Sequence, residues 1–177
     1  AYGSALTFDT TAATTATVST GTSGSITQVS FIISNNNITD TGGATITERG
    51  VVYMEGTSGD PTTLDSESSE SGSFGTGTYN RTVSSLSAST SYRVRAFAVN
   101  SAGTSYGSTI TVETSAIAVP TVTTSACDDI TYNSATANGN ITSTNGGTVT
   151  RRGFCYMSGT SGDPTTANDV EYSDGSF

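Results

Sequence analysis

Acidic side chains in predicted turns are the first residues of this chain whose type suits chemistry. Two of them precede a proline in a glycine-rich turn and two are adjacent; the four are Asp60, Asp128, Asp129 and Asp163. Carboxylate and loop carbonyl oxygens are good calcium ligands, so these aspartates are candidate metal ligands. Aspartate side chains equally cap turns by bonding to nearby backbone groups. The sequence has no closely spaced DxDxD cluster, which favours turn capping, and we expect no cofactor.

Three more carboxylates, Asp65, Glu67 and Glu70, lie in the segment LDSESSESGS. Paired carboxylates at a fixed separation carry out glycoside hydrolysis. Here they sit in a serine-rich stretch with no apolar neighbour to raise the pKa of one of them. A solvated strand edge that resists edge-to-edge pairing is therefore favoured. The chain also has no histidine, nucleophile motif, phosphate-binding loop or metal-ligand spacing, so we expect no enzymatic activity.

The charge balance disfavours one class of partner. The chain carries 15 acidic residues against 6 basic ones, all arginine, for a net charge of −9. An acidic surface repels a phosphate backbone, so we expect no nucleic-acid partner. Arg49, Arg93 and Arg95 lie on predicted strands, where they either form a small basic patch for an acidic ligand or pair with carboxylates on the same face. We expect the pairing.

The two cysteines, Cys127 and Cys155, are a candidate disulfide. Both occur in the second of two sequence repeats, whereas the first repeat has Gly24 and Val52 at these places. Because both cysteines are present in one repeat and absent from the other, they could form a disulfide across the sandwich in an oxidising compartment. Strand alternation turns Cys155 away from the face of Phe154, so two separate thiols are the default and the bridge is the alternative.

An internal repeat organises the chain. Residues 38–74 and 141–177 align without a gap at a spacing of 103 residues, and the octapeptide GTSGDPTT begins at both Gly56 and Gly159. Residues 1–10 (AYGSALTFDT) align in the same way with residues 105–114 (SYGSTITVET). A period of about 100 residues is the length of an immunoglobulin-like sandwich.

The elements that must position these residues are strands. The sequence is rich in threonine, serine and glycine and lacks sustained helical periodicity, which indicates an all-β protein. Short alternating segments bounded by turn residues predict seven antiparallel strands, at 14–19, 28–38, 44–54, 65–70, 76–84, 91–99 and 107–114.

The last two predicted strands resemble the end of a fibronectin type III-like or related immunoglobulin-like module. The resemblance rests on Leu86 with Thr90 and Tyr92, on Val94–Ala96, on Asn100–Gly103 and on Thr111–Thr114. It implies tandem seven-stranded antiparallel β-sandwich modules, one complete and two partial, like the repeats of bacterial surface or phage structural proteins. It also implies a tyrosine corner, in which the Tyr92 ring packs in the core and its hydroxyl bonds to upstream backbone. The residues with structural roles are then Leu86, Tyr92, Gly103 in the turn, and Pro61, Pro120 and Pro164 in stiff connections.

The repeat boundaries predict three parts. Residues 1–12 are expected to be the last strand of a preceding module, 13–115 the complete module, and 116–177 the first half of a following module. The linker AIAVPT at 116–121 is short, and its proline restricts the angle between modules. Residues 1–12 and 116–177 would not together form one complete sandwich, because the counterpart of residues 75–104 would be missing. We therefore expect the chain to be a window on a longer tandem array.

These features predict a structural repeat region of an extracellular or virion fibre or stalk, on a cell surface or a virion surface. It would act as a spacer and self-associate into a filament or array, with no catalysis and no membrane span. One alternative is an adhesive module that binds a glycan or a surface protein through loops around 56–61 and 100–106. Another is an accessory region of a larger secreted enzyme.

Overall fold

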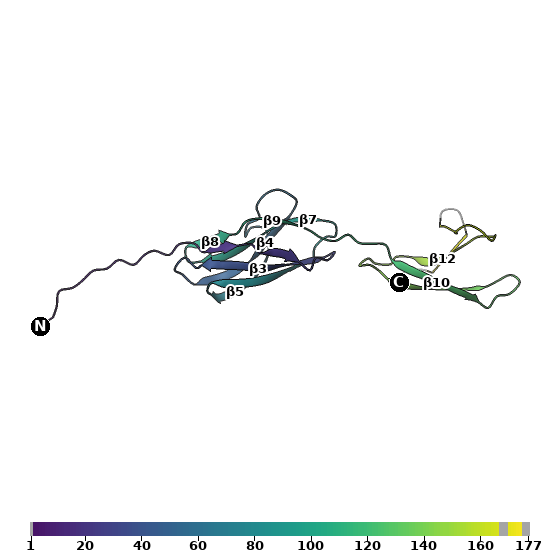
Figure 1. Ribbon diagram of the computed structural model, residues 1–177, viewed down its shortest axis with the longest axis horizontal. Helices are drawn as coiled ribbons and strands as arrows, with labels where there is room; N and C mark the ends of the chain where they lie inside the picture. Colours follow the sequence, from purple (N-terminus) through teal and green to yellow (C-terminus); the bar gives the residue numbers. More distant parts are fainter. Residues whose placement is uncertain (1, 167–169, 175–177) are drawn as a thin grey trace. The chain divides into compact units, whose positions relative to one another are not determined.

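The computed structural model of the protein describes residues 2–166 and 170–174. The chain divides into two compact units, with the division between Ala116 and Ile117 (Figure 1). Every regular element described is a β-strand, so the predicted all-β fold is confirmed. Within the described ranges no helix is long and apolar enough to cross a membrane.

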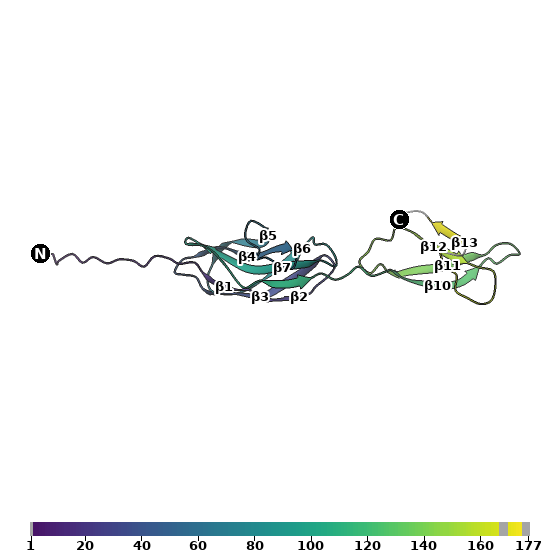
Figure 2. The ribbon, with the colours of Figure 1, turned by 90° about the horizontal axis from the view of Figure 1, so that it is seen from above.

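Unit 1 is a sandwich of two antiparallel sheets (Figure 2). In the first sheet β3 (Ser30–Asp40) is central; it pairs on one edge with β1 (Thr17–Ser19) and β2 (Thr22–Gly24), and on the other with β6 (Gly77–Ser84). The second sheet runs β5 (Ser66–Phe74), β4 (Ile46–Glu55) and β7 (Ser91–Asn100), and the outer edge of β7 pairs with β8 (Gly103–Tyr106) and β9 (Ile110–Glu113).

Nine strands are described in unit 1 rather than the seven predicted, because β2 and β8 lie outside the predicted ranges 14–19 and 107–114. The break between β1 and β2 and the break between β8 and β9 lie close together in space. The backbone N–H of Ala96 on β7 donates to Thr20 Oγ1 at 2.9 Å, in the gap between the stretches of β7 that pair with β8 and β9. A Cβ on Gly107 would lie 2.5 Å from the Thr20 backbone nitrogen, so only glycine allows this approach.

The core lies between the sheets and follows from strand alternation. Inward-facing positions of β7 (Tyr92, Val94, Ala96 and Ala98) are all buried, as a period of two predicts. They join two apolar clusters, one of Phe31, Ile33, Val51, Val83, Leu86, Tyr92, Val94 and Val112, and one of Ala16, Val18, Ile38, Ile46, Tyr79, Ala96 and Ala98. Each large side chain buried in this way stabilises the fold by about 1.5–3 kcal/mol.

A bulge in β3 buries one polar side chain in this core. The pairing register with β6 shifts between Ile33 and Asn36, and Asn35 adopts a left-handed φ of +61°. Asn36 is fully buried; its Nδ2 donates to the carbonyl oxygens of Ile33 at 3.1 Å and Tyr79 at 3.3 Å. Its Oδ1 accepts from the Gly21 N–H at 3.1 Å. The amide is thereby satisfied, and it fixes the bulge.

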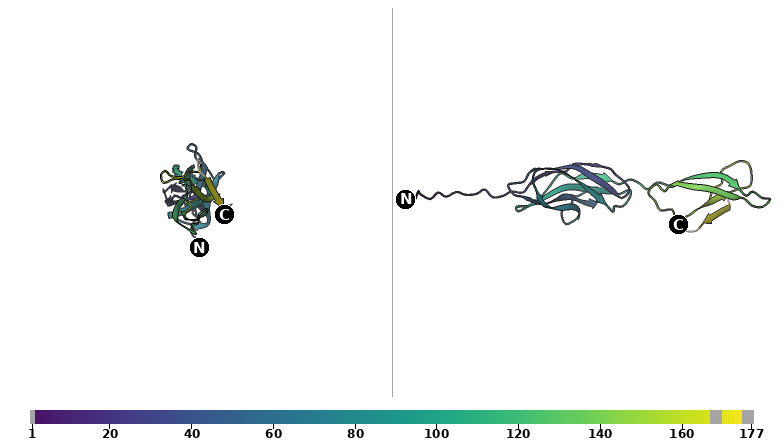
Figure 3. Two further views of the ribbon diagram at one scale, coloured as in Figure 1. Left: turned by 90° about the vertical axis from the view of Figure 1, so that its right-hand side faces the viewer. Right: turned by 90° about the horizontal axis from the view of Figure 1, so that it is seen from below.

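Unit 2 consists of two strand pairs (Figure 3). β10 (Thr121–Asp128) pairs with β11 (Thr136–Ser143), and β12 (Arg152–Tyr156) pairs with β13 (Val170–Asp174). By the repeat spacing of 103 residues, β11, β12 and β13 are the counterparts of β3, β4 and β5. Between residues 117 and 166 no described side chain is buried, in contrast to the core of unit 1.

The segment before β1 is extended and solvent-exposed. Residues 2–16 form no strand, and residues 2–15 are all exposed. The division after Ala116 lies one residue from the predicted end of the complete module. The assignment of residues 1–12 and 116–177 to neighbouring modules stays a prediction.

Candidate functional site

At the N-terminal end of unit 1, hydrogen bonds attach the segment before β1 to the turn between β3 and β4. The Thr14 N–H donates to the Gly42 carbonyl at 2.9 Å, and Asn100 Nδ2 donates to the carbonyls of Thr14 at 2.7 Å and Thr41 at 2.8 Å. Gly42 has a φ of +67°, and a Cβ there would clash with the Thr14 carbonyl oxygen. The buried Asn100 therefore holds this segment and this turn together.

At the C-terminal end of unit 1, hydrogen bonds attach the segment after β9 to the sandwich. The Ser115 N–H donates to the Thr27 carbonyl at 2.9 Å, and Thr114 Oγ1 donates to the Ser87 carbonyl at 2.6 Å. The Thr114 side chain is only 2% exposed. Thr27 precedes β3 and Thr41 follows it, so the chain enters and leaves unit 1 at opposite ends of the strands. Figure 1 shows this path.

Tyr92, the predicted corner residue, lies at this C-terminal end. Its hydroxyl accepts from the Ser87 N–H at 3.0 Å and donates to Glu55 Oε1 at 3.1 Å. The ring is buried, with its centroid 6.1 Å from that of Phe31, and Leu86 is buried in the same cluster. Ring burial with a hydroxyl bonded to upstream backbone is the arrangement of a tyrosine corner.

The loop that contains the first GTSGDPTT motif is bonded to the outer face of the second sheet. Arg93 Nε donates to the Gly59 carbonyl at 2.9 Å, and Arg93 Nη2 lies 3.4 Å from Asp60 Oδ1. Thr109 Oγ1 donates to the same carboxylate oxygen at 2.6 Å. This hydrogen bond, together with the charges of Arg95 and Arg93, lowers the pKa of Asp60 against a smaller opposing effect of desolvation.

A second arginine holds the next part of this loop. Arg95 Nε donates to the Pro61 carbonyl at 2.5 Å, and its guanidinium carbon lies 4.1 Å from the centre of the Tyr106 ring. The Tyr106 hydroxyl accepts from the Thr63 N–H at 3.1 Å. Pro61 is fully buried beneath the loop, whereas the repeat-equivalent Pro164 is exposed.

The two loops predicted to form one binding end begin at opposite ends of unit 1. The Gly56 N–H donates to the Ser91 carbonyl at the C-terminal end, whereas the turn at Asn100–Gly103 lies beside Thr14 at the N-terminal end. Gly103 has a φ of +136°, which explains glycine in that turn. The first loop reaches the second only after its proline, where Thr63 bonds to Tyr106.

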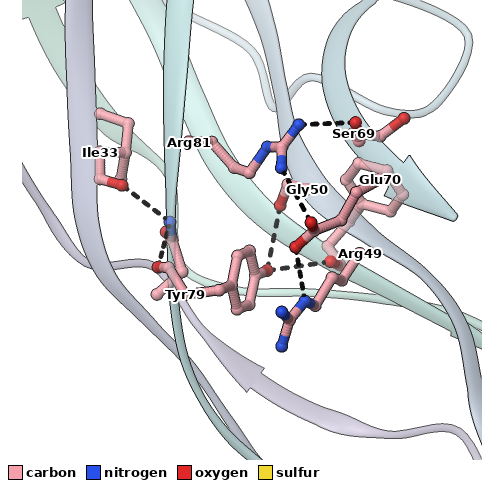
Figure 4. Close-up of polar contacts among 9 residues, drawn as sticks. Ile33, Arg49, Gly50, Ser69, Glu70, Tyr79 and Arg81 are labelled. Atoms are coloured by element: carbon pink, nitrogen blue, oxygen red, sulfur yellow. Dashed lines mark hydrogen bonds and ion pairs between the residues drawn. The ribbon is translucent and has the colours of Figure 1, made fainter. Parts of the chain in front are cut away.

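A charged cluster of Arg49, Glu70 and Arg81 lies where β5 of the second sheet meets β6 of the first (Figure 4). Glu70 lies between two arginines, with Arg49 Nε 2.8 Å from Oε1 and Arg81 Nη1 3.4 Å from Oε2. The Arg49 guanidinium also stacks 4.1 Å from the centre of the Phe74 ring. Arg49 and Arg93 therefore pair with carboxylates of their own unit, as expected, whereas Arg95 bonds to the Pro61 carbonyl and stacks on Tyr106.

Tyr79 lies beside this cluster and is buried against both sheets. Its hydroxyl lies 3.1 Å from the carbonyl oxygens of Gly50 and Phe97, which are paired residues of β4 and β7 (Figure 4). Burial raises the pKa of this hydroxyl well above its ordinary value, although the nearby Arg49 opposes the shift. The tyrosine thus links the first sheet to the backbone of the second.

The candidate calcium ligands are not brought together. Asp60 bonds to Arg93 and Thr109, while Asp128 Oδ2 accepts from Asn138 Nδ2 at 2.8 Å and Asp129 Oδ2 accepts from Thr136 Oγ1 at 3.4 Å. Asp163 is exposed in the loop of the second repeat. Among the described residues no three or more His, Cys, Asp or Glu side chains are grouped to hold a metal ion.

The cysteines are separate thiols in the structure. Cys127 is exposed on β10, and Cys155 is half-buried on β12, a strand of the other pair in unit 2. The candidate disulfide is therefore not formed. Pro120, the predicted linker residue, is exposed just before β10.

An open groove of about 820 Å³ lies between the two strand pairs of unit 2. Its apolar lining comes from β10, β11 and β12 and the segment before β12, with Val122, Ile141, Val149 and Phe154. A Cβ on Gly139 of β11 would lie 3.2 Å from the Phe154 ring, so the ring packs across the unit onto β11.

No sequence motif marks the buried amides and hydroxyls at the ends of unit 1. Position 100 continues the inward alternation of Tyr92, Val94, Ala96 and Ala98, so alternation alone would place Asn100 against the core. Nothing comparable marks Asn36, because the bulge changes the alternation of β3 at that point.

Comparisons with known proteins give structural likenesses only. No protein-family profile and no curated protein matches the sequence. The sensor domain of the anti-sigma factor RsgI4 of Pseudobacteroides cellulosolvens is 20% identical, with a TM-score of 0.45 over 58% of this chain and 77% of that one. A fourth FNIII domain of human is 24% identical, with a TM-score of 0.46 over 67% of this chain and 94% of that one.

Proposed function

We propose that the chain is a structural repeat region of an extracellular or virion fibre or stalk, in which β-sandwich modules act as spacers and assembly elements without catalysis. The observation that carries this proposal is that the chain enters and leaves unit 1 at opposite ends and is hydrogen-bonded to the sandwich at both. Tension along the chain then loads whole strands rather than one exposed turn, which is what a spacer requires.

In unit 2 the incoming segment is likewise bonded to the turn that follows β11, the counterpart of β3, although a different side chain donates. Asn145, in the turn after β11, donates from Nδ2 to the Val119 carbonyl at 2.5 Å and lies 3.3 Å from Thr121 Oγ1. The side chain of Ile117 approaches Gly147 of the same turn. Both units thus tie their incoming segment to equivalent turns, which supports an array of like modules.

Adhesion through the loops at 56–61 and 100–106 is the alternative from sequence. The hydrogen bonds of Arg93 and Arg95 to the first of these loops favour a spacer, because a loop held on the sheet presents fewer free groups to a ligand. An accessory region of a secreted enzyme would share this fold, and it is distinguished by its neighbours in the full polypeptide.

Pulling the chain by its two ends in a single-molecule force experiment tests the proposal. We expect one all-or-none step that releases roughly 100 residues, about 350 Å of contour, when unit 1 unfolds. Asn100→Ala should lower the unfolding force, because it removes the bonds to Thr14 and Thr41, whereas the exposed Ser101→Ala serves as the matched control. Gradual extension with no step would contradict a load-bearing spacer, and tight binding in a glycan screen would favour the adhesive alternative.

A further inference from the structure

An open pocket of about 270 Å³ lies at the C-terminal end of unit 1, between the last residues of β4 and the connection from β6 to β7. On β4, Tyr53 and Glu55 are two residues apart, so both side chains point toward the first sheet, as that of Val51 does. Ser66 of the neighbouring strand β5 is paired with Tyr53, and Ser85 follows β6 of the other sheet. Residues from both sheets of unit 1 therefore form the walls of this pocket.

The floor of the pocket is apolar and belongs to the core. Leu86 and Tyr92 line it and are 8% and 3% exposed. The ring of the half-buried Tyr53 lies edge-on to that of Tyr92, with 6.3 Å between the ring centroids. Because the core holds these side chains in place, the apolar surface is formed before any ligand binds.

The exposed residues of the pocket are polar, and several of them have open hydrogen-bonding positions. Glu55 Oε1 accepts from the Tyr92 hydroxyl at 3.1 Å, and Oε2 has no partner within the described residues. The hydroxyls of Tyr53, Ser66 and Ser85 also make no hydrogen bond within the part of the chain that the structure describes. One carboxylate oxygen and three hydroxyls around the same small volume can accept hydrogen bonds from a single ligand.

The charge and the size of the pocket select the ligand. Glu55 is the only charged side chain in the described lining, so a cation is attracted by the carboxylate and by the neighbouring aromatic rings, and an anion is repelled. The volume is below that of pockets for drug-sized molecules, which suits a group the size of one side chain. A primary ammonium on a short alkyl chain meets both conditions. Its three N–H donors match the oxygen atoms, and its methylenes match the apolar floor.

Such a group must come from another molecule. All six basic residues of the chain are arginine, so the chain has no lysine side chain to offer. The repeat also limits the site to unit 1. At the spacing of 103 residues Ser158 replaces Glu55, whereas Tyr156 retains the ring of Tyr53. We therefore expect unit 2 to lack the charged group of this pocket.

We propose that the pocket beside Glu55 binds a primary alkylammonium group, either a free amine or the lysine side chain of a partner protein. The ammonium donates to Glu55 Oε2 and to the surrounding hydroxyls, and the alkyl chain lies on Leu86 and Tyr92. This goes beyond the spacer function, because a module with such a pocket also attaches a cationic ligand.

Titration of the 177-residue chain with n-butylammonium, followed by the amide resonances in NMR spectra, tests the site. We expect saturable shifts at residues 53–55, 66 and 85–86 and none at residues 156–158. n-Butyrate, which carries the opposite charge on a similar alkyl chain, should give no saturable shift.

A lysine derivative distinguishes the two sources of the ammonium group. Lysine with its α-amino group acetylated and its carboxyl group amidated should bind, and the same compound acetylated on the side-chain nitrogen should not. Tighter binding of the lysine derivative than of n-butylammonium assigns the site to a protein side chain. Equal or weaker binding assigns it to a free amine.

Glu55→Gln is the discriminating variant, because it removes the charge and keeps an oxygen that can accept from Tyr92. It should weaken the binding of n-butylammonium by about tenfold or more. Ser66→Phe, which fills the pocket from an exposed position, should abolish binding with the charge intact. The matched control Glu113→Gln removes the same charge from an exposed residue of β9 outside the pocket and should bind like the wild type.

Four results would each overturn the proposal. They are an absence of saturable shifts with both amines, saturable shifts with n-butyrate, wild-type affinity in Glu55→Gln, and equal weakening in Glu55→Gln and Glu113→Gln. Each of them would leave the spacer function intact, because that function is tested by force on a single chain.

Discussion

Tyr79 shows how one residue can hold a sandwich together. Its ring lies in the apolar cluster with Ile38 and Ile46, while its hydroxyl reaches backbone carbonyls on two strands of the opposite sheet. Sequence alternation on β6 places Tyr79 inward, but the hydroxyl partners depend on how far apart the sheets lie. A buried hydroxyl with a partner contributes to stability, whereas a carbonyl left without one is destabilising.

Tyr79→Phe should therefore lower the free energy of unfolding by about 1–2 kcal/mol, because it removes the only side-chain donor to these carbonyls among the described residues. Urea unfolding monitored by tyrosine fluorescence or circular dichroism measures the change. Tyr53→Phe is the control, since the half-buried Tyr53 makes no hydroxyl hydrogen bond within the described residues. Equal stability of Tyr79→Phe and wild type would show that the bonds are not needed.

The same hydroxyl predicts a pH dependence. Burial raises the pKa of Tyr79 in the folded state, while in the unfolded chain it ionises near its ordinary value of about 10. The unfolded state therefore loses this proton first, and stability falls as pH rises above about 10, by about 1.4 kcal/mol per pH unit from this group. Unfolding curves between pH 8 and 11 should show this fall in the wild type and a smaller one in Tyr79→Phe. Identical slopes would contradict the assignment.

At the scale of elements, the sequence predicts strands well and their interruptions poorly. Each of the seven predicted strands overlaps a described strand, because alternation bounded by turn residues marks its position, as in β7. The break between β8 and β9 lies beside Thr20, in the connection between β1 and β2 far away in the sequence, and no local pattern reveals that contact. The placement of the first GTSGDPTT loop likewise depends on Arg93 and Arg95, which local sequence shows only as an exposed basic pair.

The bulge in β3 should be sensitive to its buried amide. Asn36→Ala removes two donated bonds and one accepted bond, and it leaves buried backbone groups of Ile33 and Tyr79 short of a donor. We expect a loss of about 2–4 kcal/mol in the free energy of unfolding. Asn35→Gly, which suits the left-handed conformation one residue earlier, should change stability by less than about 1 kcal/mol. Similar losses in the two variants would place the effect in the backbone rather than in the amide.

The loop on the second sheet should open when its central arginine is removed. Arg95→Ala eliminates the bond to Pro61 and the stacking on Tyr106, so amide exchange in residues 57–65 should speed up by about tenfold. Arg49→Ala, on the charged cluster at the β5 edge, is the control and should leave exchange in this loop unchanged. If Arg95→Ala leaves exchange in residues 57–65 as slow as in the wild type, the loop is held by other contacts.

At the scale of the whole molecule, the internal repeat predicts the division into units, and the structure places it between Ala116 and Ile117. The repeat does not predict the contrast between them, namely a closed core in unit 1 and no buried side chain between residues 117 and 166. Burial depends on which strands are present to cover an apolar face, and the aligned residues carry no information on that.

Electron microscopy of the native material, with intact mass measured on the same sample, tests the central claim that these modules build a fibre. The account predicts regular filaments with an axial repeat of about 35–40 Å per module, set by the length of strands such as β3. It also predicts a particle mass far above the 17.9 kDa of this chain. Monodisperse particles of 17.9 kDa, with no filaments, would contradict the account.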